Sequence, residues 1–201
     1  MGAYVTMDEK AKHLPTIVAG GLSHGAVPVS GNSYQGHGWS KGCAIELDGS
    51  LAKAGLLKDG AEMWISFLFH TQKGGGGIRV SLQSADGKEG IGFLYSRSSD
   101  TFILHGGKEK KNLFVKGMLP DTTYLFAAKM IWGKDGQPDQ WIPYFVKDDL
   151  RLPEKHGRTF KDPINIDQSK LSRLVLQGGA GTPLDEIRVG PTFESVIGAA
   201  K

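Results

Sequence analysis

Three stretches of the sequence place polar and aromatic side chains along one side of a predicted β-strand. Residues 62–70 and 78–83 alternate apolar with mostly polar positions, and residues 173–177 carry polar side chains at both ends of one face. Successive side chains of a strand point to opposite faces, so each stretch has one core-facing row and one outward row. The residues predicted to face outward are Trp64, Ser66 and His70 in the first stretch, Arg79, Ser81 and Gln83 in the second, and Arg173 and Gln177 in the third.

These side-chain types suit a surface that binds sugars. Sugar hydroxyls exchange hydrogen bonds with the planar groups of Arg, Gln and His, and the apolar face of a sugar ring stacks on an aromatic side chain. The same polar rows have a simpler interpretation, because the outer face of any sandwich sheet meets water. From the sequence, both interpretations remain open.

Further aromatic residues could serve as stacking platforms near loops. Trp141, with Tyr144 close by in the chain, is predicted to be exposed, and Trp39 lies in a glycine-rich segment predicted to be a loop. Trp132 is in phase with the apolar positions of residues 122–132 and is therefore predicted to be buried. Loops presented by a rigid scaffold commonly carry binding residues.

The spacing of the carboxylates argues against hydrolysis by a pair of acids. A retaining glycosidase holds its two carboxyl groups about 5–5.5 Å apart, and acids at alternate positions of a strand would share one face. Glu46 and Asp48 alternate but end in a turn, whereas Asp185 and Glu186 are adjacent and are predicted to point to opposite faces. The sequence therefore favours binding over this chemistry.

Other kinds of site lack their usual sequence patterns. The histidines are dispersed, without the HxH or HExxH spacing of zinc sites. The single cysteine, Cys43, excludes an internal disulfide and is predicted to be a buried small hydrophobe. The glycine run 74–77 lacks the Lys-Ser or Lys-Thr of a phosphate-binding loop. A net charge of +3 is too small to favour nucleic acid, and no apolar run is long enough to predict membrane insertion.

The composition indicates many short strands. Glycine accounts for 29 of 201 residues, roughly twice its usual share, and without a collagen period such glycine is typical of turns between strands. About nine strand-like stretches follow one another at short spacing, with one helical turn predicted at residues 51–57 and a long loop at residues 147–170. This pattern predicts an all-β sandwich or barrel.

Residues 184–196, with the sequence LDEIRVGPTFESV, resemble the closing strand of bacterial concanavalin A-like (laminin G-like) jelly-roll domains, which are common in planctomycete, verrucomicrobial and PEP-CTERM secreted proteins. Residues 18–23, 63–69 and 171–177 look like that family's early glycine-leucine segment, central strand and penultimate strand. The family's usual opening segment, rich in tryptophan and glycine, is not found before residue 18. The resemblance implies a two-sheet antiparallel jelly-roll sandwich as a single domain over residues 18–197, with residues 1–17 as a flexible segment, tag or linker and residues 198–201 as a tail.

The resemblance also implies a role for Asp185. In many jelly-roll carbohydrate modules an aspartate of the last strand binds a structural Ca²⁺, a cation that prefers oxygen ligands. The alternative is that Asp185 or Glu186 pairs with Arg188. The family further implies secretion or display on the cell surface, with a signal peptide outside the present sequence.

This fold hosts both binding proteins and enzymes, so function has to be argued from the site. The first hypothesis is a non-catalytic, lectin-like module that binds a poly- or oligosaccharide. The alternatives are a glycoside-active enzyme similar to three-keto-glycoside hydrolases or glucanases, and a purely structural adhesion domain of the cell surface. Under the first hypothesis we expect Trp64→Ala or Trp141→Ala to abolish sugar binding with little loss of stability. The predicted ligand-binding residues are Trp39, Trp64, His70, Arg79, Gln83, Trp141, Tyr144, Arg173 and Gln177.

Overall fold

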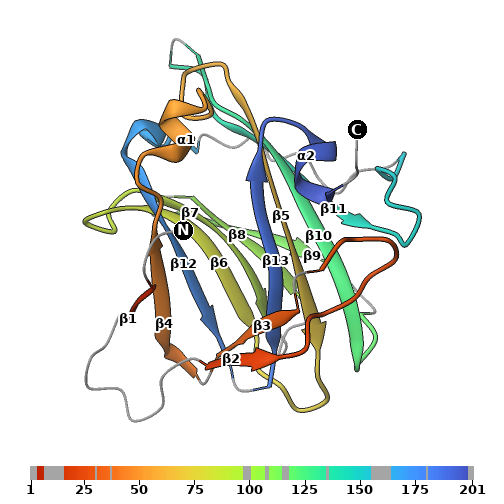
Figure 1. The fold of residues 1–201 in the computed structure, drawn as a ribbon. Coiled ribbons are helices and arrows are strands. Elements are labelled where there is room, and N and C mark those ends of the chain that lie inside the picture. Colours follow the sequence, from red (N-terminus) through yellow and green to blue (C-terminus); the bar gives the residue numbers. More distant parts are fainter. Residues whose placement is uncertain are drawn as a thin grey trace.

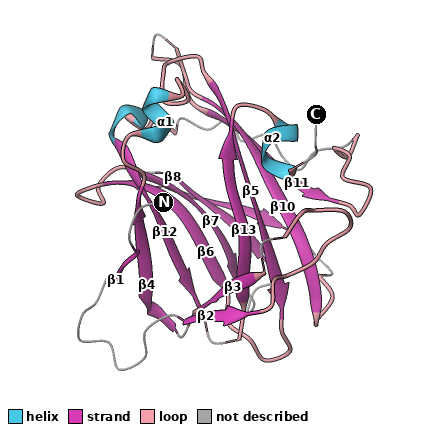
Figure 2. Cartoon of the chain, viewed as in Figure 1, coloured by secondary structure: helices cyan, strands magenta, loops and turns pink. Residues whose placement is uncertain are grey.

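The computed structural model describes ten segments of the chain: residues 4–6, 16–29, 31–36, 38–96, 101–106, 109–114, 118–134, 136–154, 164–179 and 181–198. Their strands form two antiparallel sheets that pack face to face (Figures 1 and 2). The predicted jelly-roll sandwich is thereby confirmed. None of the described helices has the length and hydropathy needed to cross a membrane.

The two sheets are built from strands that are distant in sequence. The first sheet has, in spatial order, β1 (Tyr4–Thr6), β4 (Gly38–Glu46), β12 (Leu171–Gly178), β6 (Ile78–Ser84), β7 (Gly90–Ser96), β8 (Thr101–Gly106) and β9 (Glu109–Phe114). The second sheet has β11 (Gln140–Val146), β10 (Thr122–Ile131), β5 (Glu62–Thr71), β13 (Pro183–Gly190), β3 (Asn32–Gln35) and β2 (Thr16–Ala19). The helical elements are α1 (Ser50–Lys53), within the helical turn predicted at residues 51–57, the 3-10 turn η1 (Gln168–Lys170) and α2 (Phe193–Ile197).

Aromatic side chains fill the space between the sheets. Phe126 of β10 packs on Phe67 of the neighbouring β5, with ring centroids 5.0 Å apart. Across the interface, Phe126 stacks on Phe102 of β8 and meets Phe93 of β7, both at 4.9 Å. All four rings are almost completely buried. Because strand side chains alternate, this core fixes the opposite rows of β6, β7 and β8 on the outer face of the first sheet.

The outer face of the second sheet is covered rather than open. Helix α2 packs on β13, β5 and β10 (Figure 1). It begins at a capping box in which Thr192 and Ser195 exchange hydrogen bonds, and it ends at Gly198 in the left-handed region. Strand β13 ends at Gly190, so the motif LDEIRVGPTFESV is a strand only in its first part, and residues 193–196 belong to α2.

Trp64 lies under this cover. Its ring stacks on Tyr144 of β11 at 5.7 Å and contacts Phe193 of α2 at 5.4 Å, and only 6% of the residue is exposed. The alternation correctly placed Trp64 on the outer face of its sheet. The prediction that it is an exposed stacking platform is wrong, because α2 and Tyr144 bury that face.

Trp141 is also a core residue. It is 1% exposed and lies against Trp132 and Phe93, with centroids 6.3 and 6.0 Å away. The prediction that Trp132 is buried is confirmed, and its indole N–H donates to the Leu56 carbonyl at 2.6 Å. The prediction that Trp141 is exposed is wrong, because the register pairs it with Met130 on the core face of β10.

Strands of both sheets include residues from 1–17, the segment predicted to lie outside the domain. Residues 4–6 form the edge strand β1, which pairs with β4. Strand β2 begins at Thr16 and pairs with β3, so the predicted boundary at residue 18 falls within β2.

Trp141→Ala should reduce the free energy of unfolding by about 3–5 kcal/mol, since it removes a large side chain from a closed core. Urea denaturation followed by circular dichroism measures this loss. Leu119→Ala is the control, because Leu119 is 64% exposed and its truncation should change stability little. An unfolding free energy of Trp141→Ala equal to that of the unmodified chain would show that Trp141 is not in the core.

Candidate functional site

A polar groove lies on the outer face of the first sheet. Strands β6 and β12 are neighbours, and their register pairs Arg79 with Gln177 and Gln83 with Arg173. Arg79 donates a hydrogen bond from Nη1 to Oε1 of Gln177 at 3.2 Å. Four of the predicted binding residues are therefore on one face, as their alternation indicated, and all four are half-buried.

Two glycines of β7 form the floor of this groove. Gly90 is paired with Gln83, and Gly92 is paired with Ser81 on one side and His105 of β8 on the other. Without side chains at 90 and 92, the surface is lower there than along the neighbouring strands. A Cβ on Gly92 would lie 2.5 Å from the Ser81 hydroxyl oxygen, so a side chain there would displace that hydroxyl and fill the floor. The resulting groove has a volume of about 140 Å³ and is lined by Arg79, Ser81, Gln83, Gly87, Lys88, Gly90, Ile91, Gly92 and His105.

Two apolar side chains, Leu94 and Ile103, lie on the same face of the sheet beside the residues that line the groove. Arg79 is paired in register with Leu94 of β7, which is followed across the sheet by Ile103 of β8. Both apolar side chains are half-buried. The arrangement places amide, guanidinium, imidazole and hydroxyl groups beside a small apolar surface, which is what a sugar ring with polar edges and an apolar face requires.

The remaining predicted residues do not join this groove. Strand β5 belongs to the second sheet, so Trp64 and His70 lie on the opposite side of the molecule from Arg79. There the His70 Nδ1 is 3.1 Å from the Thr123 hydroxyl, and Tyr144 stacks on Trp64. Their prediction as part of one site with Arg79 is wrong. Trp39 lies in β4, not in a loop, and its side chain is outside the described part of the structure.

Asp185 ties the closing strand to the N-terminal loop. Its Oδ2 accepts from the Leu22 backbone N–H at 2.7 Å, and its Oδ1 accepts from that of Glu186 at 2.8 Å. Glu186 has a left-handed φ of 47° at a bulge in β13, and its carboxylate pairs with Arg188 at 2.7 Å. Within the described segments, no group of three or more acidic, histidine or cysteine side chains could hold a metal ion. Both oxygens of the Asp185 carboxylate thus accept hydrogen bonds from backbone N–H groups. The calcium site at Asp185 stays a prediction.

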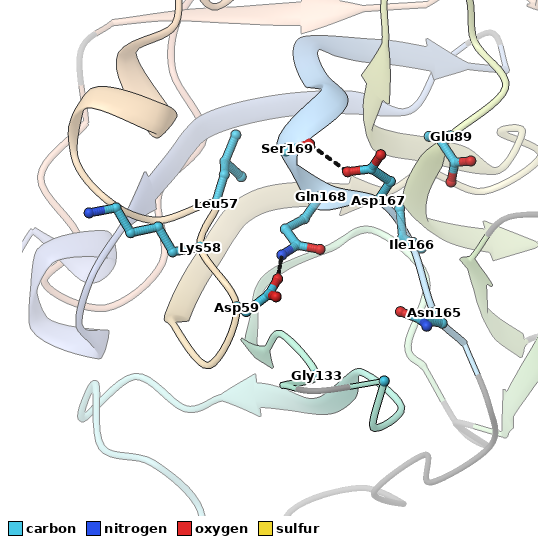
Figure 3. A pocket seen from close by; sticks show the side chains of 11 residues that line it. Leu57, Lys58, Asp59, Glu89, Gly133, Asn165, Ile166, Asp167, Gln168 and Ser169 are labelled. Atoms are coloured by element: carbon cyan, nitrogen blue, oxygen red, sulfur yellow. Dashed lines mark hydrogen bonds between the residues drawn. The ribbon is translucent and has the colours of Figure 1, made fainter.

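A larger cleft lies at the end of the sandwich beside η1 (Figure 3). Its volume is about 790 Å³, and three carboxylates, Asp59, Glu89 and Asp167, are among its lining residues. Asp59 accepts a hydrogen bond from Gln168 at 2.6 Å. Hydrogen bonds from Ser169 and Lys170 lower the pKa of Asp167, whereas a general acid needs a raised pKa. Asp167 is therefore not prepared to act as the general acid of a glycoside hydrolase.

Comparison with known proteins bears on the fold alone. No protein-family model matches this chain, and no curated protein matches it in sequence. The receptor-binding domain of the botulinum neurotoxin C/D mosaic serotype has a similar structure, with a TM-score of 0.54, 9% identity and coverage of 96% of this chain and 49% of that chain. This chain has a jelly-roll sandwich fold.

Two further solved structures are similar at lower scores. The carbohydrate-binding module CBM66 from Bacillus subtilis has a TM-score of 0.47 at 13% identity, with coverage of 87% of this chain and 94% of that one. Chicken galectin 2 has a TM-score of 0.44 at 12% identity, with coverage of 64% and 89%. This chain spans about half the length of the neurotoxin domain but nearly all of the two smaller proteins.

Gly90, Gly92 and His105 belong to the groove but are not among the binding residues predicted from the sequence. The signal for the floor is Gly-Ile-Gly at residues 90–92, since two glycines at a spacing of two leave one face of a strand without side chains. His105 could be assigned only from the register that pairs it with Gly92.

Asp185→Asn should lower the free energy of unfolding by about 1–3 kcal/mol in the presence of a calcium chelator, since an amide cannot accept from both backbone N–H groups with the geometry of a carboxylate. Burial raises the pKa of Asp185 above its ordinary value of 3.8. The folded protein thus holds this proton more tightly than the unfolded chain, and the difference between the two proteins should shrink as the pH rises above 3.8.

Urea denaturation with chelator and with added calcium provides the measurement. An Asp185→Asn variant as stable as the unmodified chain in chelator, but lacking a stabilisation that calcium gives the unmodified chain, would instead identify Asp185 as a calcium ligand.

Proposed function

We propose that this chain is a non-catalytic, lectin-like carbohydrate-binding module whose glycan lies in the groove on the outer face of the first sheet. The supporting observation is the glycine floor of β7, which lies between the Arg79, Ser81 and Gln83 row of β6 and His105 of β8. Polar side chains on the rest of a sheet surface are explained by water alone. A depression that two glycines leave open, bordered by planar hydrogen-bonding groups, is better explained by a ligand.

The chemistry of the groove supports binding by hydrogen bonds rather than by tryptophan stacking. Among the residues that line it there is no tryptophan, tyrosine or phenylalanine. Leu94 and Ile103 offer an apolar contact at one end, and the guanidinium, amide and imidazole groups offer donors and acceptors to hydroxyls. The described residues that line the groove include no carboxylate, which supports a binding role over two-carboxylate hydrolysis.

The proposed module belongs to the bacterial concanavalin A-like jelly-roll family and acts outside the cytoplasm. The segments at residues 18–23, 63–69, 171–177 and 184–196 support membership of the bacterial concanavalin A-like family of secreted proteins. In the structure these segments lie in β2 and the loop that follows it, in β5, in β12, and in β13 with α2. A module of this family would act outside the cytoplasm, where polysaccharides are available.

The double variant Arg79→Ala/His105→Ala should abolish or strongly weaken glycan binding. Each side chain borders the groove from a different strand, and loss of one hydrogen bond to a charged group costs about 1.5–3 kcal/mol, or tenfold or more in affinity. Affinity electrophoresis through gels that contain a panel of plant, algal and bacterial polysaccharides measures the binding.

The matched control is Arg151→Ala/His70→Ala, which removes the same side-chain types outside the groove. Retardation of the unmodified chain and of the control, but not of the groove variant, supports the proposal. Equal retardation of all three proteins places the site elsewhere, and no retardation by any polysaccharide would contradict a glycan-binding function and favour a structural module.

A further inference from the structure

The two arginines of the groove face are partly removed from water. Arg79 and Arg173 are both half-buried, and the Nε of each is buried without a hydrogen-bond partner. Burial also lowers the pKa of Arg79, which indicates that its charge is poorly solvated. Burying a charge is costly unless a partner of opposite charge or a set of hydrogen bonds compensates it.

No carboxylate of the described segments compensates these charges. The hydrogen-bond partner of Arg79 is the neutral amide of Gln177, and neither arginine takes part in an ion pair with a described acidic residue. Glu46 is the register partner of Arg173 on β4, but it is exposed and forms no ion pair with it.

Two other half-buried cations of the described segments have a carboxylate partner. On the second sheet, Lys129 is 23% exposed and forms an ion pair with Glu62 at 2.7 Å. Arg188 is 21% exposed and pairs with Glu186 at 2.7 Å. The contrast sets Arg79 and Arg173 apart from these two cations, because no described residue supplies a counter-charge for them.

We propose that the groove selects an acidic oligosaccharide, whose sulfate or carboxylate groups pair with the guanidinium groups of Arg79 and Arg173. This inference rests on the proposed function and specifies the class of glycan. Guanidinium groups bind both kinds of oxyanion through two parallel N–H donors. Arg79 and Lys88 are the charged side chains that line the groove itself, and Lys88 extends its positive charge to the rim.

The spacing of the two arginines favours an oligomer over a single sugar. Arg173 is opposite Gln83, four residues along β6 from Arg79, a distance of about 13 Å at the usual rise of a strand. This backbone spacing is longer than one sugar ring. An oligosaccharide with acidic groups on separate units can meet both arginines. The glycine floor and Leu94 of β7 lie beside the stretch of β6 that separates Arg79 from Gln83.

The test uses pairs of polymers that share a backbone and differ in charge: dextran with dextran sulfate, and methyl-esterified pectin with polygalacturonate. Affinity electrophoresis or titration calorimetry of the full chain should give binding to one or both acidic polymers at least about tenfold tighter than to their neutral partners. The preference should weaken as the salt concentration rises. The two acidic polymers distinguish sulfate from carboxylate, and a preference for either supports the inference.

Arg79→Gln and Arg173→Gln remove the charge while keeping a planar hydrogen-bonding group. Each should lose most of the preference for the acidic polymer and keep its thermal midpoint within a few degrees. Arg151→Gln is the control, since it changes the net charge equally at an exposed position outside the groove. Equal weakening by the Arg151 control would show attraction by net charge alone and would overturn the inference.

The remaining outcomes separate the two proposals. If neutral and acidic polymers bind equally well, and the Arg79→Ala/His105→Ala variant loses both, the glycan site stands and the acidic preference is wrong. If no member of either polymer pair binds while another polysaccharide of the panel does, the acidic preference is again wrong. If no polysaccharide binds at all, the proposed function itself fails.

Discussion

The aromatic packing between the two sheets determines which face of the first sheet can meet a ligand. Phe93 of β7 and Phe102 of β8 contact Phe126 of the opposite sheet with ring centroids 4.9 Å apart. Each of these contacts fixes the phase of its strand, because a shift by one residue would move every side chain to the other face. With Phe93 in the core, Gly92 is on the outer face, and the register places Ser81 and His105 beside it. The groove is therefore a consequence of the core.

The two outer faces of the sandwich differ in what covers them. On the second sheet, α2 and the loop at residues 20–29 bury Trp64, and His24 of that loop lies 2.9 Å from the Val146 carbonyl. On the first sheet, the corresponding face retains a half-buried polar row with two arginines that lack a carboxylate partner among the described residues. The proposed function is based on this difference, since the face on which no described helix packs is the one with a glycine floor and with two arginines that have no described carboxylate partner.

Much of the fold and part of the site could be predicted because both depend on the period of two along a strand. That period placed Phe67 and Phe69 in the core and Arg79, Gln83, Arg173 and Gln177 on an outer face. It also places Trp141 and Tyr144, three residues apart in one strand, on opposite faces, so their joint assignment to a site could have been rejected from the sequence.

The remaining features depend on contacts between distant segments. Neither the assignment of β5 to the second sheet nor the burial of Trp64 by α2 is contained in a local pattern. Strand β3 and the first part of β4 lie in a stretch so rich in glycine that it predicts a loop. The pairing of Gly92 with His105 needs the register between β7 and β8, which turn and strand patterns alone do not fix.

The most direct measurement of the central claim is nuclear magnetic resonance of the isotope-labelled chain during titration with an oligosaccharide that binds it. The account predicts that the largest shifts are those of the Gly90, Gly92 and His105 backbone amides and of the Arg79 and Arg173 side-chain N–H groups. Shifts concentrated instead at Asp59, Gln168 and Ser169 would place the ligand in the cleft at the end of the sandwich and would contradict the account.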